Sequence, residues 1–125
     1  MSAVGGDVQA PMRVALVGAG VIGTHHGRVI SELKDRLELV AVVDLQVERA
    51  QQLAAEHGGR AFSSLGDALA EAQIDVVTIC TPTGRHGEGA IEALQAGKHV
   101  IIEKPAEVTV AKTDEIVAAQ RRAGT

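Results

Sequence analysis

Aromatic side chains are almost absent from this chain of 125 residues, which has one phenylalanine and neither tyrosine nor tryptophan. Proteins that bind single-stranded nucleic acid stack bases on aromatic rings, so the composition argues against that function. The formal net charge is −4, and no run of basic residues provides the positive surface expected of a protein that binds DNA or RNA. Nucleic acid is therefore not an expected partner, and the core must be built from aliphatic side chains.

Cysteine is equally scarce, and long apolar stretches are missing. Cys80 is the only cysteine, so no disulfide can form within the chain, and we expect a reducing, cytoplasmic environment. No apolar stretch approaches the roughly 18 residues of a membrane span, and the first residues lack the apolar core of a signal peptide. The chain has no cysteine cluster and no pair of histidines at chelating spacing, so no metal site is predicted.

The chain is expected to comprise a flexible leader, residues 1–11, and one domain, residues 12–125. Within that domain, short apolar runs alternate with segments of helical period. We predict strands at 13–17, 39–43, 60–62, 75–80 and 99–102, and helices at 21–34, 47–57, 64–72, 85–96 and 109–123. Strands that are apolar throughout are typical of a parallel sheet buried on both faces. Right-handed crossovers then predict an α/β fold, a Rossmann-type doubly wound sheet of about five strands with helices on both faces.

Residue types at the ends and on the faces of these helices give further expectations. Ser64 and Thr109 are expected to cap the starts of two helices, and Gly58 to end another. Helical spacing predicts that several apolar side chains face the core, namely Ile22, Val29, Ile30 and Leu33 in the first helix and Ile116 and Val117 in the last.

The strongest motif is Gly-Ala-Gly-Val-Ile-Gly at 18–23, which follows an expected strand directly and opens an expected helix. Gly18 permits the tight turn, Gly20 lets a pyrophosphate approach the backbone, and Gly23 lets the helix pack close to the strand. Backbone N–H groups at the helix start then bind phosphate oxygens. Since the chain has 14 glycines, a glycine-rich turn without a ligand is the alternative, but the context favours dinucleotide binding.

Asp44 ends the second expected strand, about 20 residues after the glycine motif, where a carboxylate can accept hydrogen bonds from the adenosine ribose. Because a 2′-phosphate would meet that negative charge, NAD is expected to be preferred over NADP. The alternative is that Asp44 caps the following helix, and the two roles are compatible.

Further segments in the same order and spacing carry a family resemblance. They are Thr81-Pro82 followed by His86, then Ala96-Gly97-Lys98-His99-Val100, and then Glu103-Lys104-Pro105. With the glycine motif and Asp44, they resemble the glucose–fructose oxidoreductase/inositol dehydrogenase/rhizopine-catabolism (Gfo/Idh/MocA) family over residues 12–124. The resemblance implies a two-domain NAD(P)-dependent oxidoreductase of sugars, sugar nucleotides and cyclitols.

The resemblance also implies roles for particular residues. Lys104 would be the catalytic lysine beside the nicotinamide and the substrate hydroxyl, and Glu103 would bond the nicotinamide ribose. The expected cofactor contacts are Gly18, Gly20, Val21, Ile22, Gly23, Asp44, Thr81, Pro82, His86, Glu103 and Lys104. Independently of the family, these segments follow strands and so share the sheet edge where ligands bind. A cation beside an alcohol oxygen there would stabilise a developing alkoxide, although a solvent-facing lysine is the plain alternative for Lys104.

Family members continue into a second domain that supplies most of the substrate pocket, and this chain is expected to lack it. The leading hypothesis is the NAD(H)-binding domain of an oxidoreductase that transfers hydride between a nicotinamide and a sugar-like or cyclitol alcohol, with association into a homo-oligomer possible. The alternatives are a non-catalytic NAD-binding module or gene fragment, and an NAD-dependent glycosidase of the same family. The 125 residues alone are expected to bind NAD(H) without useful turnover.

Overall fold

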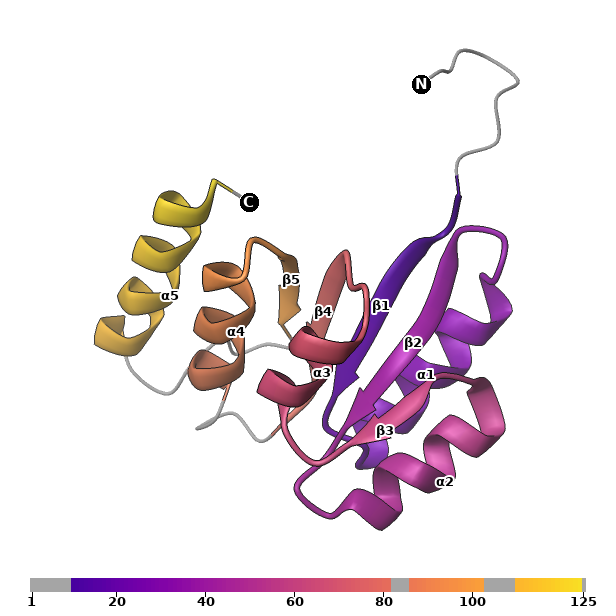
Figure 1. Ribbon diagram of the computed structural model, residues 1–125. Coiled ribbons are helices and arrows are strands. Elements are labelled where there is room, and N and C mark those ends of the chain that lie inside the picture. Colours follow the sequence, from indigo (N-terminus) through magenta and orange to yellow (C-terminus); the bar gives the residue numbers. More distant parts are fainter. Residues whose placement is uncertain (1–9, 82–85, 103–109, 125) are drawn as a thin grey trace.

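A five-stranded parallel sheet with helices on both faces forms the centre of the computed structural model, which describes residues 10–81, 86–102 and 110–124 (Figure 1). The elements alternate along the chain as β1 (Met12–Val17), α1 (Val21–Glu32), β2 (Leu37–Val43), α2 (Val47–His57), β3 (Arg60–Phe62), α3 (Leu65–Glu71), β4 (Val76–Ile79), α4 (His86–Gln95), β5 (His99–Ile102) and α5 (Val110–Ala123). The strand order is β3-β2-β1-β4-β5. This confirms the predicted Rossmann-type sheet. The expected leader falls almost entirely outside the described residues.

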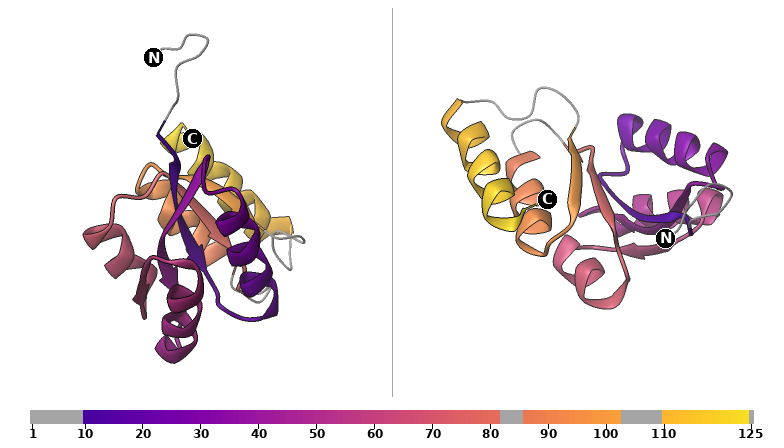
Figure 2. Two further views of the ribbon diagram at one scale, coloured as in Figure 1. Left: turned by 90° about the vertical axis from the view of Figure 1, so that its right-hand side faces the viewer. Right: turned by 90° about the horizontal axis from the view of Figure 1, so that it is seen from above.

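The strand order reverses direction at β1. From β1 the chain builds outward through β2 to β3, and it then returns to place β4 on the other side of β1. The view from above in Figure 2 separates α1 from α3, α4 and α5 across the sheet. Since the chain leaves β1 and β4 toward opposite faces, a crevice opens at the carboxyl ends of these strands. We call this edge of the sheet the carboxyl edge.

Alternate residues of β1 supply two separate cores. Val14 and Leu16 pack with side chains of α1 and α2, whereas Ala15 and Val17 pack with side chains of α3 and α4. All four are buried, as expected for a central strand of a parallel sheet. The two cores pack against both faces of β1 and hold this strand in place. The turn that follows Val17 is therefore also held in place at its start.

The predicted helix ends are partly testable. The Ser64 hydroxyl accepts a hydrogen bond from the Asp67 N–H at 3.1 Å, which confirms Ser64 as the cap of α3. Gly58 ends α2 with φ +100°, in the left-handed region that favours glycine. The expected cap Thr109 lies outside the described residues. Nowhere in the described ranges is a helix both long and apolar enough to cross a membrane.

The predicted inward face of α1 is wrong in part. Ile30 is buried, but Ile22, Val29 and Leu33 are 49%, 39% and 45% exposed. The buried positions of α1 are instead Gly23, Gly27 and Ile30. Two glycines one turn apart let the helix backbone approach its neighbours, so the larger apolar side chains lie at its flanks. The helix also ends at Glu32, before the predicted end at Lys34.

Two further burial predictions fail near the carboxyl terminus. In α5, Ile116 is buried as predicted but Val117 is 40% exposed. In β5, Val100 and Ile102 pack toward α4 and α5, whereas Ile101 on the opposite face is 56% exposed. In the described part of the chain no helix covers that face of β5, so this strand is not buried on both faces.

Candidate nucleotide-binding site

The glycine-rich turn joins β1 to α1 at the carboxyl edge, and two of its glycines are fixed by the fold. Gly18 has φ +98°, and a Cβ atom there would lie 2.8 Å from the carbonyl carbon of Cys80. A Cβ atom on Gly23 would lie 1.8 Å from the carbonyl oxygen of Gly18. Neither position accepts a side chain. Gly18 adopts the backbone conformation that the turn requires, and Gly23 lets α1 pack against the backbone of the turn.

Gly20 differs from both of these glycines. Its φ of −80° is open to any residue, and a Cβ atom there would meet no atom of the described residues within 4 Å. Neither backbone strain nor packing of the described residues therefore requires glycine at this position. The space beside it is free for a ligand, which is the feature that a pyrophosphate subsite needs.

Gly20 is also the N-cap of α1, and no side chain caps this helix end. The first helical hydrogen bond joins the Thr24 N–H to the Gly20 carbonyl at 2.8 Å. The N–H groups of residues 21–23 precede it and have no carbonyl partner within the helix. The first turn carries no acidic residue, so its electrostatics suit an anion. The predicted contacts Val21 and Ile22 are exposed here.

Asp44 follows β2 and reaches into the glycine-rich turn. Its Oδ2 accepts a hydrogen bond from the Ala19 N–H at 2.8 Å, and its Oδ1 accepts one from the Gln46 N–H at 2.8 Å. The second bond closes a short Asx-type turn. The N-cap of α2 is Gln46, so the alternative that Asp44 caps this helix is wrong. Instead, its carboxylate ties the end of β2 to the turn.

The ends of three strands converge around this turn. The Gly18 N–H donates to the Val43 carbonyl of β2 at 2.7 Å, and the Cys80 N–H, just after β4, donates to the Val17 carbonyl of β1 at 2.7 Å. The backbone nitrogen of Thr81 lies 2.9 Å from the position that a Cβ of Gly18 would take. The structure therefore brings Thr81 to the glycine-rich turn.

The remaining predicted site residues are not placed in this way. Pro82, Glu103 and Lys104 lie outside the described residues, and His86 is described only as the first residue of α4. Conversely, sequence reasoning missed Ala19. Its contact with Asp44 is made by a main-chain N–H group, so the residue type carries no signal of it.

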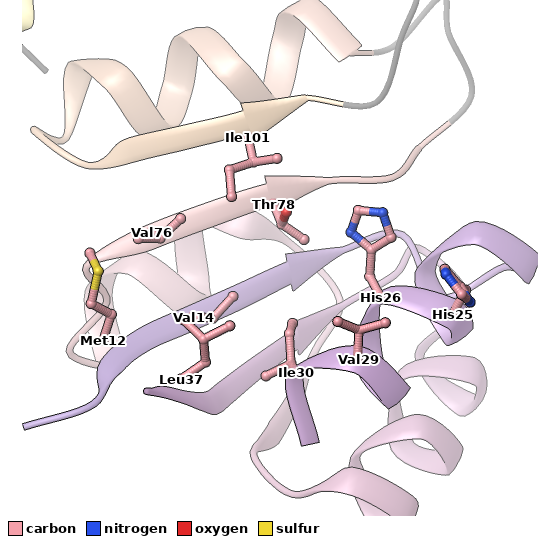
Figure 3. A pocket seen from close by; sticks show the side chains of 10 residues that line it. All are labelled: Met12, Val14, His25, His26, Val29, Ile30, Leu37, Val76, Thr78 and Ile101. Atoms are coloured by element: carbon pink, nitrogen blue, oxygen red, sulfur yellow. The ribbon is translucent and has the colours of Figure 1, made fainter. Parts of the chain in front are cut away.

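A separate apolar hollow of about 340 Å³ lies between α1 and the strands β1, β2, β4 and β5, on the face of the sheet where no described helix covers β5 (Figure 3). Its lining residues are Met12, Val14, His25, His26, Val29, Ile30, Leu37, Val76, Thr78 and Ile101. None of the glycines of the turn lines it, and neither does Asp44, so this hollow is distinct from the candidate nucleotide site. Among the described residues no group of three or more His, Cys, Asp or Glu side chains could hold a metal ion.

A glycine-rich turn between the first strand and helix, with a carboxylate at the end of the second strand, defines a dinucleotide-binding domain of the Rossmann class. The chain belongs to the oxidoreductase family with an NAD-binding Rossmann fold, GFO_IDH_MocA, whose model matches residues 12–125. This confirms the family resemblance drawn from the sequence motifs.

Named relatives share this region. The 4-carboxy-2-hydroxymuconate-6-semialdehyde dehydrogenase of Sphingobium sp. is 35% identical over 114 residues, which are 90% of this chain and 36% of the relative. Inositol 2-dehydrogenase 3 of Saccharopolyspora erythraea is 34% identical over 113 residues, with 90% and 33% covered. The chain thus spans about a third of the length of these curated relatives.

A solved structure gives the same relationship. The WlbA dehydrogenase of Bordetella pertussis, crystallised with NADH and UDP-GlcNAcA, superposes with a TM-score of 0.87 and 40% sequence identity. The superposition covers 91% of this chain and 35% of the dehydrogenase chain.

Proposed function

We propose that the Gly18–Gly23 turn and Asp44 bind NAD(H), and that this domain serves an oxidoreductase acting on a sugar-like or cyclitol alcohol. The observation that carries the proposal is the open space beside Gly20. Packing explains the other two glycines of the motif. It does not explain Gly20, whereas the space that a bound pyrophosphate needs beside the backbone does. The direct experiment is a calorimetric titration of the purified chain with NADH, which should give saturable binding.

The pyrophosphate would be held by main-chain donors. The N–H groups of residues 21–23 and the positive end of the α1 dipole lie at the same helix start as Gly20. These donors are held in place because α1 packs closely against the turn at Gly23 and against Leu53 and His57 of α2 at Gly27. A preorganised set of donors binds an anion with little ordering penalty.

The adenosine ribose would be held by Asp44, whose carboxylate oxygens can each accept a further hydrogen bond. We propose a preference for NAD over NADP on this ground. Leu45 and Gln46, the next two residues, carry no positive charge. Arg49, in the first turn of α2, is the nearest cation further along the chain, so a 2′-phosphate placed at Asp44 would meet the carboxylate first.

The nicotinamide end of the site is proposed from the family pattern. The strands β4 and β5 both end at the carboxyl edge, and in the sequence Thr81 and Pro82 come after β4 and Glu103 and Lys104 come after β5. When bound, the nicotinamide supplies hydride transfer. Lys104 would stabilise negative charge on the substrate oxygen, Glu103 would bond the nicotinamide ribose, and His86 would line the same end of the site.

The substrate class rests on the relatives. Inositol 2-dehydrogenase is named for a cyclitol, and the WlbA structure contains a sugar nucleotide. Since the chain spans about a third of such proteins, we propose that the 125 residues bind cofactor without useful turnover by themselves. A cytoplasmic location, based on the lone Cys80, and association into a homo-oligomer remain predictions.

A further inference from the structure

Two consecutive N–H groups of the glycine-rich turn are held by the end of β2. The Gly18 N–H donates to the Val43 carbonyl at 2.7 Å, and the Ala19 N–H donates to Asp44 Oδ2 at 2.8 Å. The first bond continues the sheet ladder and does not depend on any side chain. The second depends entirely on the carboxylate of Asp44, which lies 25 residues away in the sequence.

We propose that Asp44 is a positioning residue for the phosphate subsite, in addition to its proposed contact with the ribose; this inference rests on the proposed function. Ala19 stands between two glycines, which have the greatest backbone freedom of any residue. Its bond to Asp44 is charge-assisted and therefore stronger than a bond between neutral groups. The carboxylate fixes the Gly18–Ala19 peptide and so orients the following N–H groups, which are expected to hold the pyrophosphate.

The other carboxylate oxygen makes this arrangement rigid. Asp44 Oδ1 accepts from the Gln46 N–H at 2.8 Å, so the side chain is held at both oxygens and cannot rotate without losing a bond. The peptide of Asp44 is anchored as well, since its N–H donates to the Phe62 carbonyl of β3 at 3.1 Å. Hydrogen bonds thus connect β3 to Asp44 and Asp44 to Ala19 in the turn.

This arrangement gives the domain a second reason to prefer NAD over NADP, in addition to charge repulsion at the ribose. A 2′-phosphate placed against Asp44 would repel the carboxylate, and any displacement of that side chain would release the Ala19 N–H. NADP would then lose order in the phosphate turn as well as suffer repulsion at the ribose. The phosphate subsite and the ribose subsite are coupled through one side chain.

The positioning role can be separated from the ribose role by a ligand that lacks ribose hydroxyls. We would measure the affinity of wild type and Asp44→Ala for 2′,3′-dideoxy-ADP, which keeps the pyrophosphate. If Asp44 acts only on the ribose, its removal leaves this affinity unchanged or improves it, because a negative charge near an anion is lost. The positioning role predicts the opposite sign, a loss of about fivefold or more. Asp114→Ala, which removes an exposed carboxylate on α5, is the matched charge control and should have no effect.

A second readout needs no ligand. Amide hydrogen exchange in Asp44→Ala should accelerate at Ala19 but not at Gly18, whose partner is the main-chain carbonyl of Val43. Asp44→Leu, which keeps the approximate side-chain size but has no acceptor oxygen, gives the same comparison if the alanine variant is poorly folded. Unchanged exchange at Ala19, or dideoxy-ADP affinity that is equal or tighter in Asp44→Ala, would overturn the positioning role while leaving NADH binding intact. Failure of wild type to bind NADH would instead overturn the proposed function, and the exchange measurement would still decide the role of Asp44.

Discussion

The α-carbon of Gly23 lies so close to Gly18 that a Cβ atom added to it would stand 1.8 Å from the Gly18 carbonyl oxygen. The obstacle is backbone, which cannot move aside as a flexible side chain would. We therefore expect Gly23→Ala to lower the free energy of unfolding by at least about 2 kcal/mol. Urea unfolding followed by circular dichroism would measure this loss.

Gly27→Ala is the matched comparison in the same helix. Its Cβ would meet only side-chain atoms of His57 and Leu53, at 3.3 Å, so its loss should be smaller. Equal stability of Gly23→Ala and wild type would contradict the packing described here.

Arg13 and Asp75 join the starts of β1 and β4, at the sheet edge opposite the candidate site. The Arg13 N–H donates to Asp75 Oδ2 at 2.8 Å, and Arg13 Nε donates to the same oxygen at 3.2 Å. These bonds, the main-chain bond first, hold the pKa of Asp75 below its usual value. A lowered pKa in the folded state means that the stabilisation is complete above the usual aspartate pKa and is lost as pH falls through the folded-state value.

The expected result is a stability difference between wild type and Asp75→Asn at pH 7 that shrinks progressively below about pH 4. Urea midpoints at a series of pH values would measure it. Arg13→Gln should retain part of the pH dependence, because the main-chain donor remains. A difference that stays constant from pH 7 to pH 2.5 would exclude this contribution. Both side chains are more than a third exposed, so the effect should be modest.

Leu45 offers a way to test cofactor preference without altering Asp44. We expect wild type to bind NADH more tightly than NADPH by more than about tenfold, because in the proposed site the carboxylate would face a 2′-phosphate. Leu45 is 69% exposed beside it, so Leu45→Arg should supply a cation for a 2′-phosphate. Its expected effect is tighter NADPH binding with little change for NADH. Leu45→Gln, which is polar without the charge, is the control. Competition titrations would report both affinities, and equal affinities in wild type would refute the proposed preference.

Catalytic turnover by these 125 residues alone is not expected. Hydride transfer requires the substrate carbon to be held beside the nicotinamide, and positioning of this kind can supply about 7–11 kcal/mol of barrier reduction. The region matched by this chain makes up only 36% and 33% of two dehydrogenase relatives. A screen with NAD against inositols, aldoses and sugar nucleotides, followed by NADH absorbance, tests the expectation. Robust turnover that disappears in Lys104→Ala would show that this domain suffices for catalysis.

The sheet and the glycine-rich turn could be predicted because their signals are local. Apolar runs mark the strands, and the spacing of Gly18, Gly20 and Gly23 marks the turn. Side-chain burial was harder to predict, because it depends on what covers each surface. Val29 has the spacing of a core residue, yet the glycines of α1 take the buried face. Ile101 sits in an apolar run, yet no described helix covers it.

Some features of the site could not be found from residue types at all. The contact between Asp44 and Ala19 uses a main-chain donor, so any residue other than proline could make it. Similarly, the three glycines of the motif look equivalent in the sequence. The motif alone does not show that packing requires glycine at positions 18 and 23 but not at position 20. That distinction depends on the distances from each absent Cβ to its neighbours.

The role of Gly20 is the most direct test of the account, and one calorimetric comparison decides it. Gly20→Val places a branched side chain in space that no described atom occupies within 4 Å of the Cβ, so the protein should fold while the pyrophosphate is excluded. Gly66→Val in α3 is the matched control, since its Cβ meets only the flexible end of Glu92. The account predicts that wild type and Gly66→Val bind NADH alike and that folded Gly20→Val shows no measurable binding. NADH affinity in Gly20→Val equal to that of wild type would contradict it.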